Sequence, residues 1–482
     1  MELNEIIAQR KAKVASLKAK GLSLYDNRAF SGSITIQKAL DNFQEAGGVN
    51  LCGRVMAKRS HGKAVFMDLR DSTAKIQLYL KSDIVGEDKF RVLEDLDIAD
   101  IINIKGKLFT THTKEPTVKV EDFSVLAKAL RPLPEKWHGL KDIELRYRQR
   151  YLDLIANEEV KKVFLMRSRI MKAIRDFLDD KGYLEVETPM MHDIPGGAAG
   201  RPFKTHHNEY GIDLYLRIAP ELYLKRLLVG GLDRVYEINR SFRNEGVSTK
   251  HNPEFTMLEV YSAYANYEDM MDLAQDLIVT LAKQIWGQTK FTYQGKAIDL
   301  TPPWQRRSFA QTVKEKFAID PADEAGVMLK KLQDKGFAKG AGRLSRSQVA
   351  KIIEDILEQE MNLNPTFVTD YFTNLCPLAK TKEGNPLISE RFELYVGGVE
   401  IGNAYSELND PQEQKRRFQE EIKEGDTAEK KNVDEDYVLA LEHGMPPAGG
   451  LGIGIDRLVM LFTDQPSIRD VILFPLLRPE AK

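Results

Sequence analysis

The pattern of apolar and polar residues separates a β-rich stretch from a longer mixed part of the chain. Between Val49 and Leu130, short runs alternate between apolar and polar side chains, with turn residues between the runs. Alternation with a period of two predicts half-buried β-strands. The predicted strands lie at residues 50–56, 65–69, 74–80, 101–109 and 117–125, and a helix is predicted at 88–96. This order predicts a small five-stranded barrel.

Helical periodicity flanks the predicted barrel on both sides. Residues 1–20 place apolar side chains at helical spacing among many lysines and arginines. This basic helix is either a solvated cap on its own domain or a contact to an RNA backbone, and both interpretations stay open. Residues 157–181 predict a long amphipathic helix that ends at Gly182, and a strand at 184–187 follows it.

The C-terminal half predicts two hairpins and a glycine-rich segment in front of a helix. The strands of the first hairpin flank residues 241–255, and the second hairpin turns at Gly397-Gly398. Helices are predicted at 266–286 and, between charged turns, at about 305–365, where the chain looks like an insertion between strands. The glycines of 449–454 lead into an apolar helix.

The composition narrows the class of protein. A chain of 482 residues suits two or three domains, and a net charge of −2 argues against a protein that coats nucleic acid nonspecifically. Two cysteines offer neither a disulfide framework nor a cysteine zinc site. No apolar run reaches membrane-spanning length, and the N-terminus lacks the apolar core of a secretory signal. We therefore expect a cytoplasmic enzyme without a membrane partner.

Polar residues occupy the centre of the first hairpin, where a buried hairpin carries small or apolar ones. Arg243 offers a planar fork of donors that suits a carboxylate or a phosphate. Phe255 offers a flat face on which a base can stack. A surface hairpin held by ion pairs is the alternative. A grip for phosphate and a face for a base in one hairpin favour a nucleotide site.

Two carboxylates share one face of the second hairpin in its predicted register. In that register, Tyr395 opposes Glu400. Glu393 then opposes Gly402, which makes Glu393 and Glu400 diagonal neighbours roughly 7 Å apart. Like charges so placed repel unless a cation lies between them, and carboxylate oxygens with open positions for phosphate suit Mg²⁺. A half-solvated sheet that tolerates both charges is the alternative, and we favour the metal.

A receptor for an ammonium group follows on the same strand. Its residues are in phase with one another but out of phase with Glu400, and they are Asn403, Tyr405 and Glu407. We expect a bulge at Gly402 that turns them towards the same site. A carboxylate beside a phenol suits a primary ammonium, because the ion supplies donors and the site acceptors. Glu259 and Tyr261 of the first hairpin complete this receptor.

Three segments resemble the signature motifs of the class II aminoacyl-tRNA synthetases. Phe242-Arg243-Asn244-Glu245, followed after a loop by His251 and Phe255, resembles their second motif. The helix, glycine, strand and proline of 157–189 resemble the first motif, and Gly449 to Arg457 resembles the third. With the barrel in front, the chain after about residue 45 is similar to the bacterial-type lysyl-tRNA synthetases.

The resemblance implies an α+β protein with two functional parts. An N-terminal five-stranded OB-fold β-barrel would bind the anticodon, and a class II catalytic domain would be built on an antiparallel β-sheet flanked by helices. The implied divisions are a helical extension at 1–45, the barrel at 46–131, a linker at 132–156, and the catalytic domain at 157–482 with its helical insertion at about 305–365. The first motif implies a homodimer.

On the barrel, Phe66 and Gln77 are expected on neighbouring central strands. There, an aromatic ring stacks a base and an amide reads the edge of one. A core position is the alternative for Phe66, and the resemblance favours an anticodon contact. The acidic pair Glu121-Asp122 is a further candidate, and the sequence does not choose between its two members.

The resemblance also implies the reaction and its cofactor. Lysine would attack the α-phosphorus of ATP, with Mg²⁺ bound, to give lysyl-adenylate and pyrophosphate, and lysine would then pass to the 3′ end of tRNA(Lys). The lysine carboxylate is already ionised at neutral pH, so no protein base is required. Arg243 would act in catalysis by bridging the substrate carboxylate and the α-phosphate.

Each ligand has an expected set of residues. The amino acid is assigned to Gly197, Glu221, Arg243, Glu259, Tyr261, Asn403, Tyr405 and Glu407. ATP is assigned to Arg243, Glu245, His251, Asn252, Phe255, Glu393, Glu400, Gly454 and Arg457. Within the ATP set, Phe255 and Arg457 would enclose adenine, and Glu393 and Glu400 would hold the metal.

Two other interpretations use the same scaffold. A paralogue that lysylates a protein would lack the barrel, so residues 46–131 argue against it. A regulatory binder without catalysis would have no need of intact Arg243, Glu393 and Arg457. We therefore expect an enzyme that charges tRNA.

Overall fold

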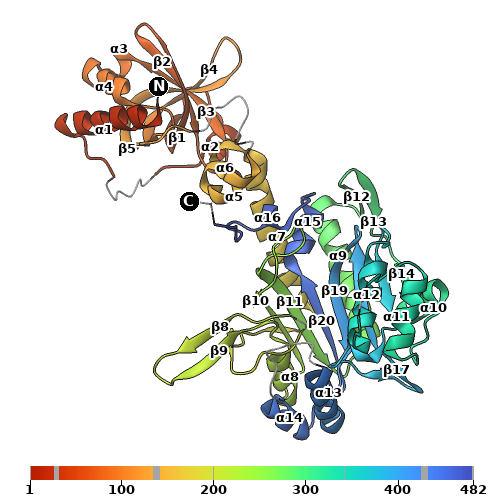
Figure 1. The fold of residues 1–482 in the computed structure, drawn as a ribbon. Helices are drawn as coiled ribbons and strands as arrows, with labels where there is room; N and C mark the ends of the chain where they lie inside the picture. The colour runs from red at the N-terminus through yellow and green to blue at the C-terminus, as the bar shows by residue number, and fades with distance from the viewer. Residues whose placement is uncertain are drawn as a thin grey trace. The chain divides into compact units, whose positions relative to one another are not determined.

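The computed structural model describes residues 2–25, 32–133, 140, 142–198, 200–340, 342–424 and 433–479. The chain divides after Lys141 into two compact units, 1–141 and 142–482 (Figure 1). This division falls inside the predicted linker at 132–156, of which residues 134–139 and 141 lie outside the described part. From Asp142 onwards, the linker belongs to the second unit, where it forms α5 (Ile143–Arg148) and α6 (Arg150–Ala156).

The first unit contains the predicted barrel. Within its described residues, five strands close in the order β1-β2-β3-β5-β4. Their bounds are β1 (Gly48–His61), β2 (Ala64–Arg70), β3 (Lys75–Lys81), β4 (Ile101–Thr110) and β5 (Pro116–Ala127). The inward positions alternate along each strand, as Val65, Met67 and Leu69 do on β2. The barrel prediction is therefore confirmed.

Short helices surround the barrel. The single helix predicted at 88–96 is split into α3 (Ser82–Val85), α4 (Glu87–Val92) and the 3₁₀ turn η1 (Leu93–Asp95). Gly86 has a φ of 85° and separates the first two, because few residues other than glycine adopt that conformation. A further short helix, α2 (Ile36–Asp41), precedes β1.

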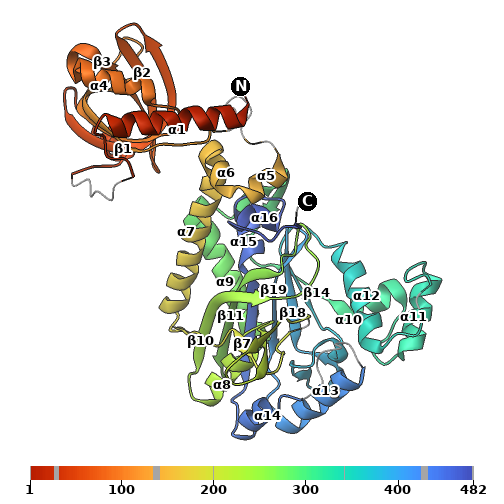
Figure 2. The same cartoon turned by 60° about the vertical axis from the view of Figure 1, so that its left-hand side comes forward.

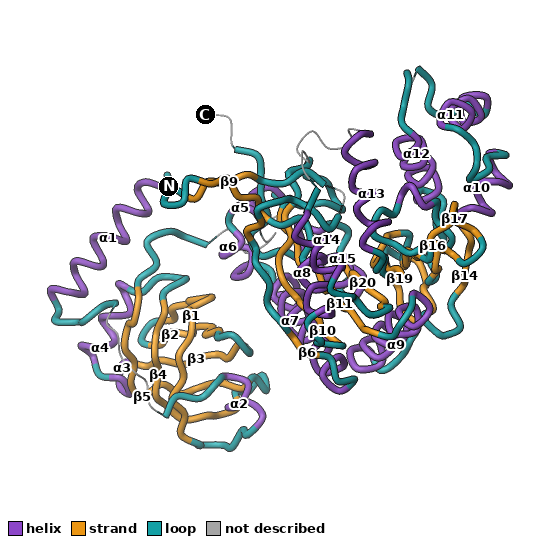
Figure 3. The backbone as a smooth tube through the Cα atoms, turned by 90° about the horizontal axis from the view of Figure 1, so that it is seen from below, coloured by secondary structure: helices purple, strands orange, loops and turns teal. Residues whose placement is uncertain are grey.

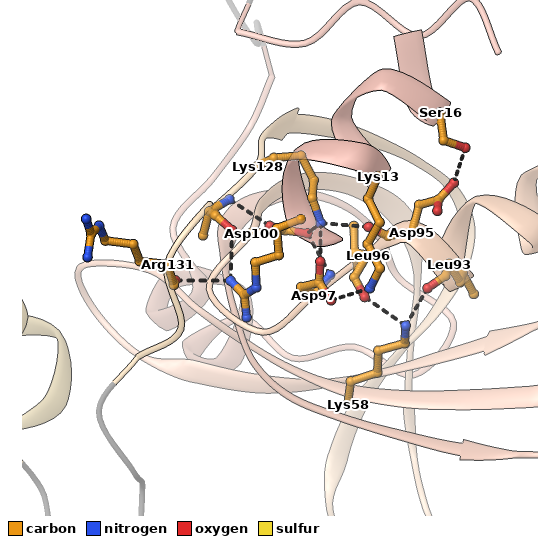
Figure 4. A network of polar contacts seen from close by, with 12 residues as sticks. Lys13, Ser16, Lys58, Leu93, Asp95, Leu96, Asp97, Asp100, Lys128 and Arg131 are labelled. Atoms are coloured by element: carbon orange, nitrogen blue, oxygen red, sulfur yellow. Dashed lines mark hydrogen bonds and ion pairs between the residues drawn. The ribbon is translucent and has the colours of Figure 1, made fainter. Parts of the chain in front are cut away.

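The basic N-terminal helix α1 (Leu3–Ala19) packs on its own barrel (Figure 4). Leu17 is fully buried in the barrel core. Arg10 donates to the carbonyl oxygens of Ala129 and Arg131 at 2.8 and 3.0 Å, where the chain leaves β5. Most of the helix's polar contacts therefore serve as a cap, which favours the first of the two interpretations of this segment.

Lys128 is the buried centre of the network that holds this cap (Figure 4). Its ammonium contacts the carboxylates of Asp97 and Asp100 and the carbonyl of Asp95. Lys13 of α1 reaches Asp97 as well, at 2.6 Å. Lys128 thus connects the end of β5 to residues 95–100, which Lys13 of α1 also contacts.

The second unit is built on a sheet that, within the described residues, has eight strands in the order β14-β15-β18-β19-β20-β11-β10-β6. Its bounds are β6 (Leu184–Glu185), β10 (Arg234–Phe242), β11 (Glu254–Ala263), β14 (Gln305–Ser308), β15 (Thr366–Thr369), β18 (Arg391–Val396), β19 (Val399–Ser406) and β20 (Ala448–Gly454). The strands are antiparallel except for a parallel pair at each edge. The predicted antiparallel core of the sheet is confirmed, and its edges make the sheet mixed.

Helices cover one face of this sheet (Figure 2). They are α7 (Glu158–Asp180), α9 (Tyr267–Trp286) and α15 (Ile455–Phe462). Their apolar sides pack with inward residues of the central strands, such as Leu258, Val260 and Ile453. Because strand side chains alternate between faces, the residues in between point to the opposite face. That opposite face carries the predicted site residues.

The remaining elements are arranged around this sheet. A small sheet forms from β7 (Met191–His192), β8 (Lys204–His207) and β9 (Ile212–Leu216), and β12 (Lys290–Tyr293) pairs with β13 (Lys296–Asp299), as β16 (Thr381–Lys382) does with β17 (Asn385–Ser389). Helix α8 (Glu221–Val229) packs near α13 (Pro411–Glu424) and α14 (Glu435–Glu442), and α16 (Ile468–Val471) follows α15.

The predicted insertion contains α10 (Phe309–Phe317), α11 (Ala325–Asp334) and α12 (Arg346–Glu358), which gather beside β14 (Figure 3). These helices form a separate hydrophobic core with residues of β15 and β18. This core includes Phe309 of α10 and Tyr395 of β18. Residues 305–308 form the edge strand β14, so the helical part of the insertion begins at Phe309.

The register of the second hairpin corrects one prediction. Tyr395 opposes Glu400 as predicted, but Glu393 opposes Asn403 and not Gly402. A bulge next to Glu400 adds one residue to β19 and shifts the pairing that follows it. The predicted bulge is present, and the error was to extend the regular register through it.

Across the described residues, no helix combines the length and the apolar character that crossing a membrane requires.

Lys128 provides a test of the cap. Lys128→Met leaves the buried carboxylate of Asp100 without its cationic partner, and breaking a buried ion pair in this way costs about 3 kcal/mol. We expect faster hydrogen exchange of the barrel strands in the full-length protein, measured by mass spectrometry. Lys89→Met, which breaks an exposed pair with Asp122, serves as the control and leaves exchange unchanged. Equal exchange in both variants would contradict the role given to Lys128.

Candidate active site

The register of four neighbouring strands places the site residues in two rows. One row runs across the sheet through Glu259, Gly452, Asn403 and Glu393. The next row runs through Tyr261, Gly450, Tyr405 and Arg391. Both rows lie on the face opposite the helical core. The bulge in β19 brings Asn403 and Tyr405 onto this face together with Glu400, because it shifts the alternation by one residue.

The glycines of β20 leave room at the centre of these rows. A Cβ atom on Gly450 would lie 1.9 Å from Glu407 Oε1 and 2.5 Å from Tyr261 Cε1. A Cβ atom on Gly452 would lie 3.2 Å from Glu259 Oε1. Glu407 and Tyr261, which are far apart in the sequence, therefore meet above the same glycine.

Three buried carboxylates and one buried lysine form what we call the acidic cluster: Glu221, Glu259, Glu407 and Lys225. Glu221 is 4% exposed, Glu259 7% and Glu407 1%. Tyr405 Oη donates to Glu221 Oε2 at 2.6 Å, and Tyr261 Oη donates to Glu259 Oε2 at 3.1 Å. Of the residues predicted to receive an ammonium group, Glu259, Tyr261, Tyr405 and Glu407 thus belong to this cluster or contact it, whereas Asn403 accepts from Arg391.

The electrostatics of the acidic cluster favour a cationic ligand. Burial, and then the charge of Glu221, raise the pKa of Glu259 to about 8. Burial likewise raises the pKa of Glu407 well above its ordinary value, against the opposing effect of Lys225. When a cation binds beside a carboxyl group whose pKa is raised in this way, it stabilises the ionised form of that group.

The glycine loop at 196–203, of which Ala199 lies outside the described residues, runs from Glu221 to Arg243. A Cβ atom on Gly197 would lie 3.3 Å from Cβ of Glu221, and its φ of 87° favours glycine. A Cβ atom on Gly200 would lie 3.1 Å from Cδ of Arg243. The loop therefore contacts both the acidic cluster and the hairpin that carries Arg243.

Arg243 lies directly beyond the end of β10. Its guanidinium is 5.1 Å from the centre of the Phe255 ring, and its Nε is buried without a hydrogen-bond partner in the described part of the chain. A buried donor without a partner is costly, so this group is available to a ligand. Glu259 and Glu400 are among the charges that act on Arg243, which places it between the acidic cluster and the carboxylates of the second hairpin.

The other residues predicted to bind the nucleotide surround Arg457 or lie in the loop before β11. Arg457 donates to the carbonyl oxygen and the carboxylate of Glu400, both at 2.9 Å, and contacts His251 Nε2 at 3.2 Å. An arginine only donates, so His251 accepts there, and burial followed by the charge of Arg457 lowers the pKa of His251. Glu245 is exposed, whereas Asn252 is buried and donates to the carbonyl of Glu254.

The nucleotide residues are therefore not all in contact with one another. The Phe255 ring faces Arg243, and Arg457 is held by Glu400 and His251. Gly454 immediately precedes α15, and a Cβ atom there would lie 3.7 Å from the Arg457 side chain and 3.8 Å from the carbonyl oxygen of Ile401.

Glu393 and Glu400 share the face predicted for a metal. Both phenols of Tyr371 and Tyr395 donate to Glu393 Oε2 at 2.7 Å, and Arg391 donates to Oε1 at 2.5 Å. Each carboxylate oxygen accepts about two hydrogen bonds, so Oε1 keeps one lone pair for a cation. Among the described residues, no group of three or more histidines, cysteines and carboxylates offers a metal site. These two carboxylates fit Mg²⁺ only if water and phosphate oxygens complete its shell.

Sequence reasoning missed several residues of this face. Lys225 lies four residues after Glu221 on α8, a spacing that brings two helical side chains together and so signalled their pair. Arg391 lies two residues before Glu393 on β18, and it also donates to Asn403 Oδ1 at 3.0 Å. Glu354 of α12 is 3.6 Å from Arg391, and no local pattern indicated that contact.

On the barrel, Phe66 and Gln77 lie on the same outer face, because Gln77 opposes Asp68, two residues from Phe66. Phe66 is partly exposed, and its ring is 5.1 Å from that of Tyr79. Gln77 Nε2 donates to Glu115 Oε2, and Gln77 Oε1 accepts from Thr117, both at 3.0 Å.

The carboxylate that contacts Gln77 comes from Glu115, a residue that the sequence analysis did not single out. The candidates Glu121 and Asp122 form exposed ion pairs with Lys107 and Lys89. A carboxylate only accepts, so Glu115 fixes which way the Gln77 amide points. Each polar end of that amide keeps capacity for one further hydrogen bond, which is what reading a base edge requires.

Comparison with known families agrees with this pairing of a barrel and an antiparallel sheet. Residues 142–478 match the family described as tRNA synthetases class II (D, K and N), and residues 49–126 match an OB-fold nucleic acid binding domain. The chain belongs to the class II tRNA synthetases of this D, K and N group, and it is an aminoacyl-tRNA synthetase. The family predicted from the three motifs is confirmed.

Three relatives of nearly the same length are about half identical to this chain. A lysine–tRNA ligase of Carboxydothermus hydrogenoformans is 53% identical over 99% of this chain and 99% of its own length. The lysine–tRNA ligase of Pelotomaculum thermopropionicum is also 53% identical, over 99% and 96% of the two chains. That of Moorella thermoacetica is 51% identical, over 99% and 98%.

Gly450 provides a test of the site. Gly450→Ala places a methyl group on Glu407 and Tyr261, so we expect amino-acid-dependent ATP–pyrophosphate exchange to fall at least about 100-fold. Exchange is measured with each standard amino acid in turn. Gly326→Ala, at a glycine of α11 with open space around it, is the matched control and keeps wild-type exchange. Normal exchange in the Gly450 variant would place the amino-acid site elsewhere.

Proposed function

We propose that this chain is a lysine–tRNA ligase that activates lysine with ATP and transfers it to the 3′ end of tRNA(Lys). The charge of the acidic cluster carries the proposal. In the ionised state that a bound cation stabilises, the three carboxylates and the ammonium of Lys225 carry two net negative charges among the described residues of the cluster. Free lysine carries two ammonium groups, so it balances this charge, whereas aspartate and asparagine do not. The full-length relatives named as lysine–tRNA ligases support the same specificity.

The proposed orientation of lysine follows from the two ends of the site. Glu221 and Gly197 meet at one position, where they bind the α-ammonium and the backbone of the substrate. Glu407 and Tyr261 meet above Gly450 and bind the ε-ammonium, with Tyr405 and Asn403 lining the same face. The substrate carboxylate then points towards Arg243, whose Nε is free to donate.

Arg243 is the proposed catalytic residue. The carboxylate of lysine is the nucleophile and is ionised at neutral pH, so the protein needs to bring it to the α-phosphorus and to offset the charge that develops. A guanidinium that binds both groups performs these tasks through orientation and charge. His251, Asn252, Glu245, Phe255, Gly454 and Arg457 are proposed to bind the nucleotide around it.

Mg²⁺ is the proposed cofactor, and it would neutralise phosphate charge and withdraw electron density from the phosphorus. Glu400 and Oε1 of Glu393 would hold it. The phenols of Tyr371 and Tyr395 and the guanidinium of Arg391 keep the Glu393 carboxylate in one orientation.

The first unit is proposed to read the anticodon. Its outer face combines the Phe66 ring for stacking with the Gln77 amide, oriented by Glu115 and Thr117, for reading a base edge. We propose the extension at 1–45, the barrel at 46–131 and the linker at 132–156 as the functional divisions before the catalytic domain.

We also propose a cytoplasmic homodimer. α7 and the segment that follows it carry exposed apolar residues: Leu165, Leu184, Met190 and Met191. Exposed apolar side chains in one segment support a surface that binds protein. A second copy of the chain is the proposed partner, through the segment that resembles the first motif.

Arg243→Ala tests the activation step. We expect lysine-dependent ATP–pyrophosphate exchange to fall about 10³-fold, because one positioned donor at a developing charge contributes this much. Arg240→Ala, on the same hairpin but in an exposed pair with Glu254, is the control and keeps wild-type exchange. If the wild-type protein exchanges with aspartate and not with lysine, the proposed specificity is wrong.

Gln77→Ala tests the anticodon step separately. We expect KM for tRNA(Lys) to rise about 10- to 100-fold, which corresponds to the loss of one pair of hydrogen bonds to a base. Lysine-dependent exchange without tRNA stays unchanged, since Gln77 belongs to the other unit. An unchanged KM for tRNA would show that the anticodon is read elsewhere.

A further inference from the structure

A fully buried lysine lies within the acidic cluster, and the mechanism above gives it no step. Lys225 on α8 has no exposed surface. Lysine is rarely buried to this extent, because removing its charge from water is costly unless the charge is paired. The burial of the Lys225 ammonium therefore depends on the charged groups that pair with it.

Lys225 bridges carboxylates from two separate elements. Its Nζ accepts no bond and donates to Glu221 Oε1 at 2.6 Å, and it also contacts Glu407 Oε2. The same ammonium lies 5.4 Å from the centre of the Tyr405 ring. Lys225 thus joins the start of α8 to the residue that follows β19.

Each bridged carboxylate turns its other oxygen away from Lys225. Glu221 Oε2 accepts from Tyr405, and Glu407 Oε1 points to the position above Gly450. Within the described structure, Glu407 Oε1 has no hydrogen-bond partner. An unpartnered, fully buried carboxylate oxygen is costly, so this oxygen is the one that gains most from an incoming ammonium.

We propose that Lys225 is a positioning residue that orients Glu221 and Glu407 and sets the charge of the cluster for a ligand with two ammonium groups. This inference rests on the proposed function and extends it to the origin of the specificity. With Lys225 present, the fully ionised cluster carries two net negative charges, which the two ammonium groups of lysine balance. An isostere with a neutral end leaves one buried carboxylate unpaired and is rejected.

A purely structural role, in which Lys225 only fills a polar gap, predicts a different response to pH. The groups that face Glu407 come from every element around it: Lys225 and Glu221 of α8, Glu259 and Tyr261 of β11, Tyr405 of β19 and Tyr437 of α14. Of these, only Lys225 is cationic. Its removal raises the pKa of Glu407, since the ionised form loses its partner. If Lys225 only filled space, its removal would leave the pH dependence of the KM for lysine unchanged.

Lys225→Met is the decisive variant, because methionine has nearly the same length and no charge. We expect KM for lysine at neutral pH to rise at least about 100-fold, whereas KM for ATP changes less than about threefold. The substrate lysine binds the ionised carboxylate of Glu407, so the KM for lysine falls as pH rises. This fall occurs at higher pH in the variant than in the wild type, measured by ATP–pyrophosphate exchange from about pH 6 to about pH 8.5.

Two further variants serve as controls. Tyr437→Phe removes a buried hydroxyl of the same surroundings, one that makes no hydrogen bond to any described residue, and it keeps the wild-type KM and pH profile. Lys225→Arg retains the charge, so its pH profile stays that of the wild type even where KM rises. If the methionine variant does not fold, Lys225→Gln is expected to give the same shift.

A measurement on the unmodified protein does not depend on any variant folding. 6-Hydroxynorleucine, the isostere with a neutral end, is expected to inhibit at least about 10³-fold more weakly than lysine binds. Comparable affinities for 6-hydroxynorleucine and lysine would overturn the inference. So would a rise in the KM for lysine of Lys225→Met that is the same at every pH, or an equal rise in its KM for ATP. Absence of lysine-dependent exchange in the wild type would instead refute the proposed function itself.

Discussion

The absence of side chains on one face of β20 is the constraint on which the proposed catalytic face depends. β20 carries glycine at the two positions where the rows of the site cross it, Gly450 and Gly452. Side chains from the strands on either side then occupy the space above it. Without that space, a side chain at position 450 would collide with Glu407 and Tyr261, and the acidic cluster would not close.

Buried charge governs the remainder of the site. Isolated carboxylates would have a large desolvation cost at these positions, so each has an ion pair or a hydrogen bond to the protein through at least one of its oxygens. Lys225 pairs two members of the acidic cluster, and Arg391 holds Glu393 while also reaching Asn403. The proposed amino-acid side and the proposed metal side are therefore connected through Arg391. Such fixed groups lose little reorganisation energy when a charged substrate binds.

The single bulge in β19 has a large effect for its size. In a regular hairpin, Asn403 and Tyr405 would point to the helical core, opposite to Glu400. One extra residue reverses the alternation, so that all three side chains share a face. The proposed ATP side and amino-acid side can thus lie on one continuous strand.

The sequence by itself determined the elements and much of the chemistry. Alternation predicted the barrel strands, and carboxylates at strand spacing indicated Glu393, Glu400 and Glu407, because these signals are local. Tertiary structure decided which distant residues meet. Glu115 accepts a hydrogen bond from Gln77, and Glu354 of the insertion lies 3.6 Å from Arg391. Contacts of this kind depend on strand order and on a one-residue shift in register, and no local pattern of side chains encodes either.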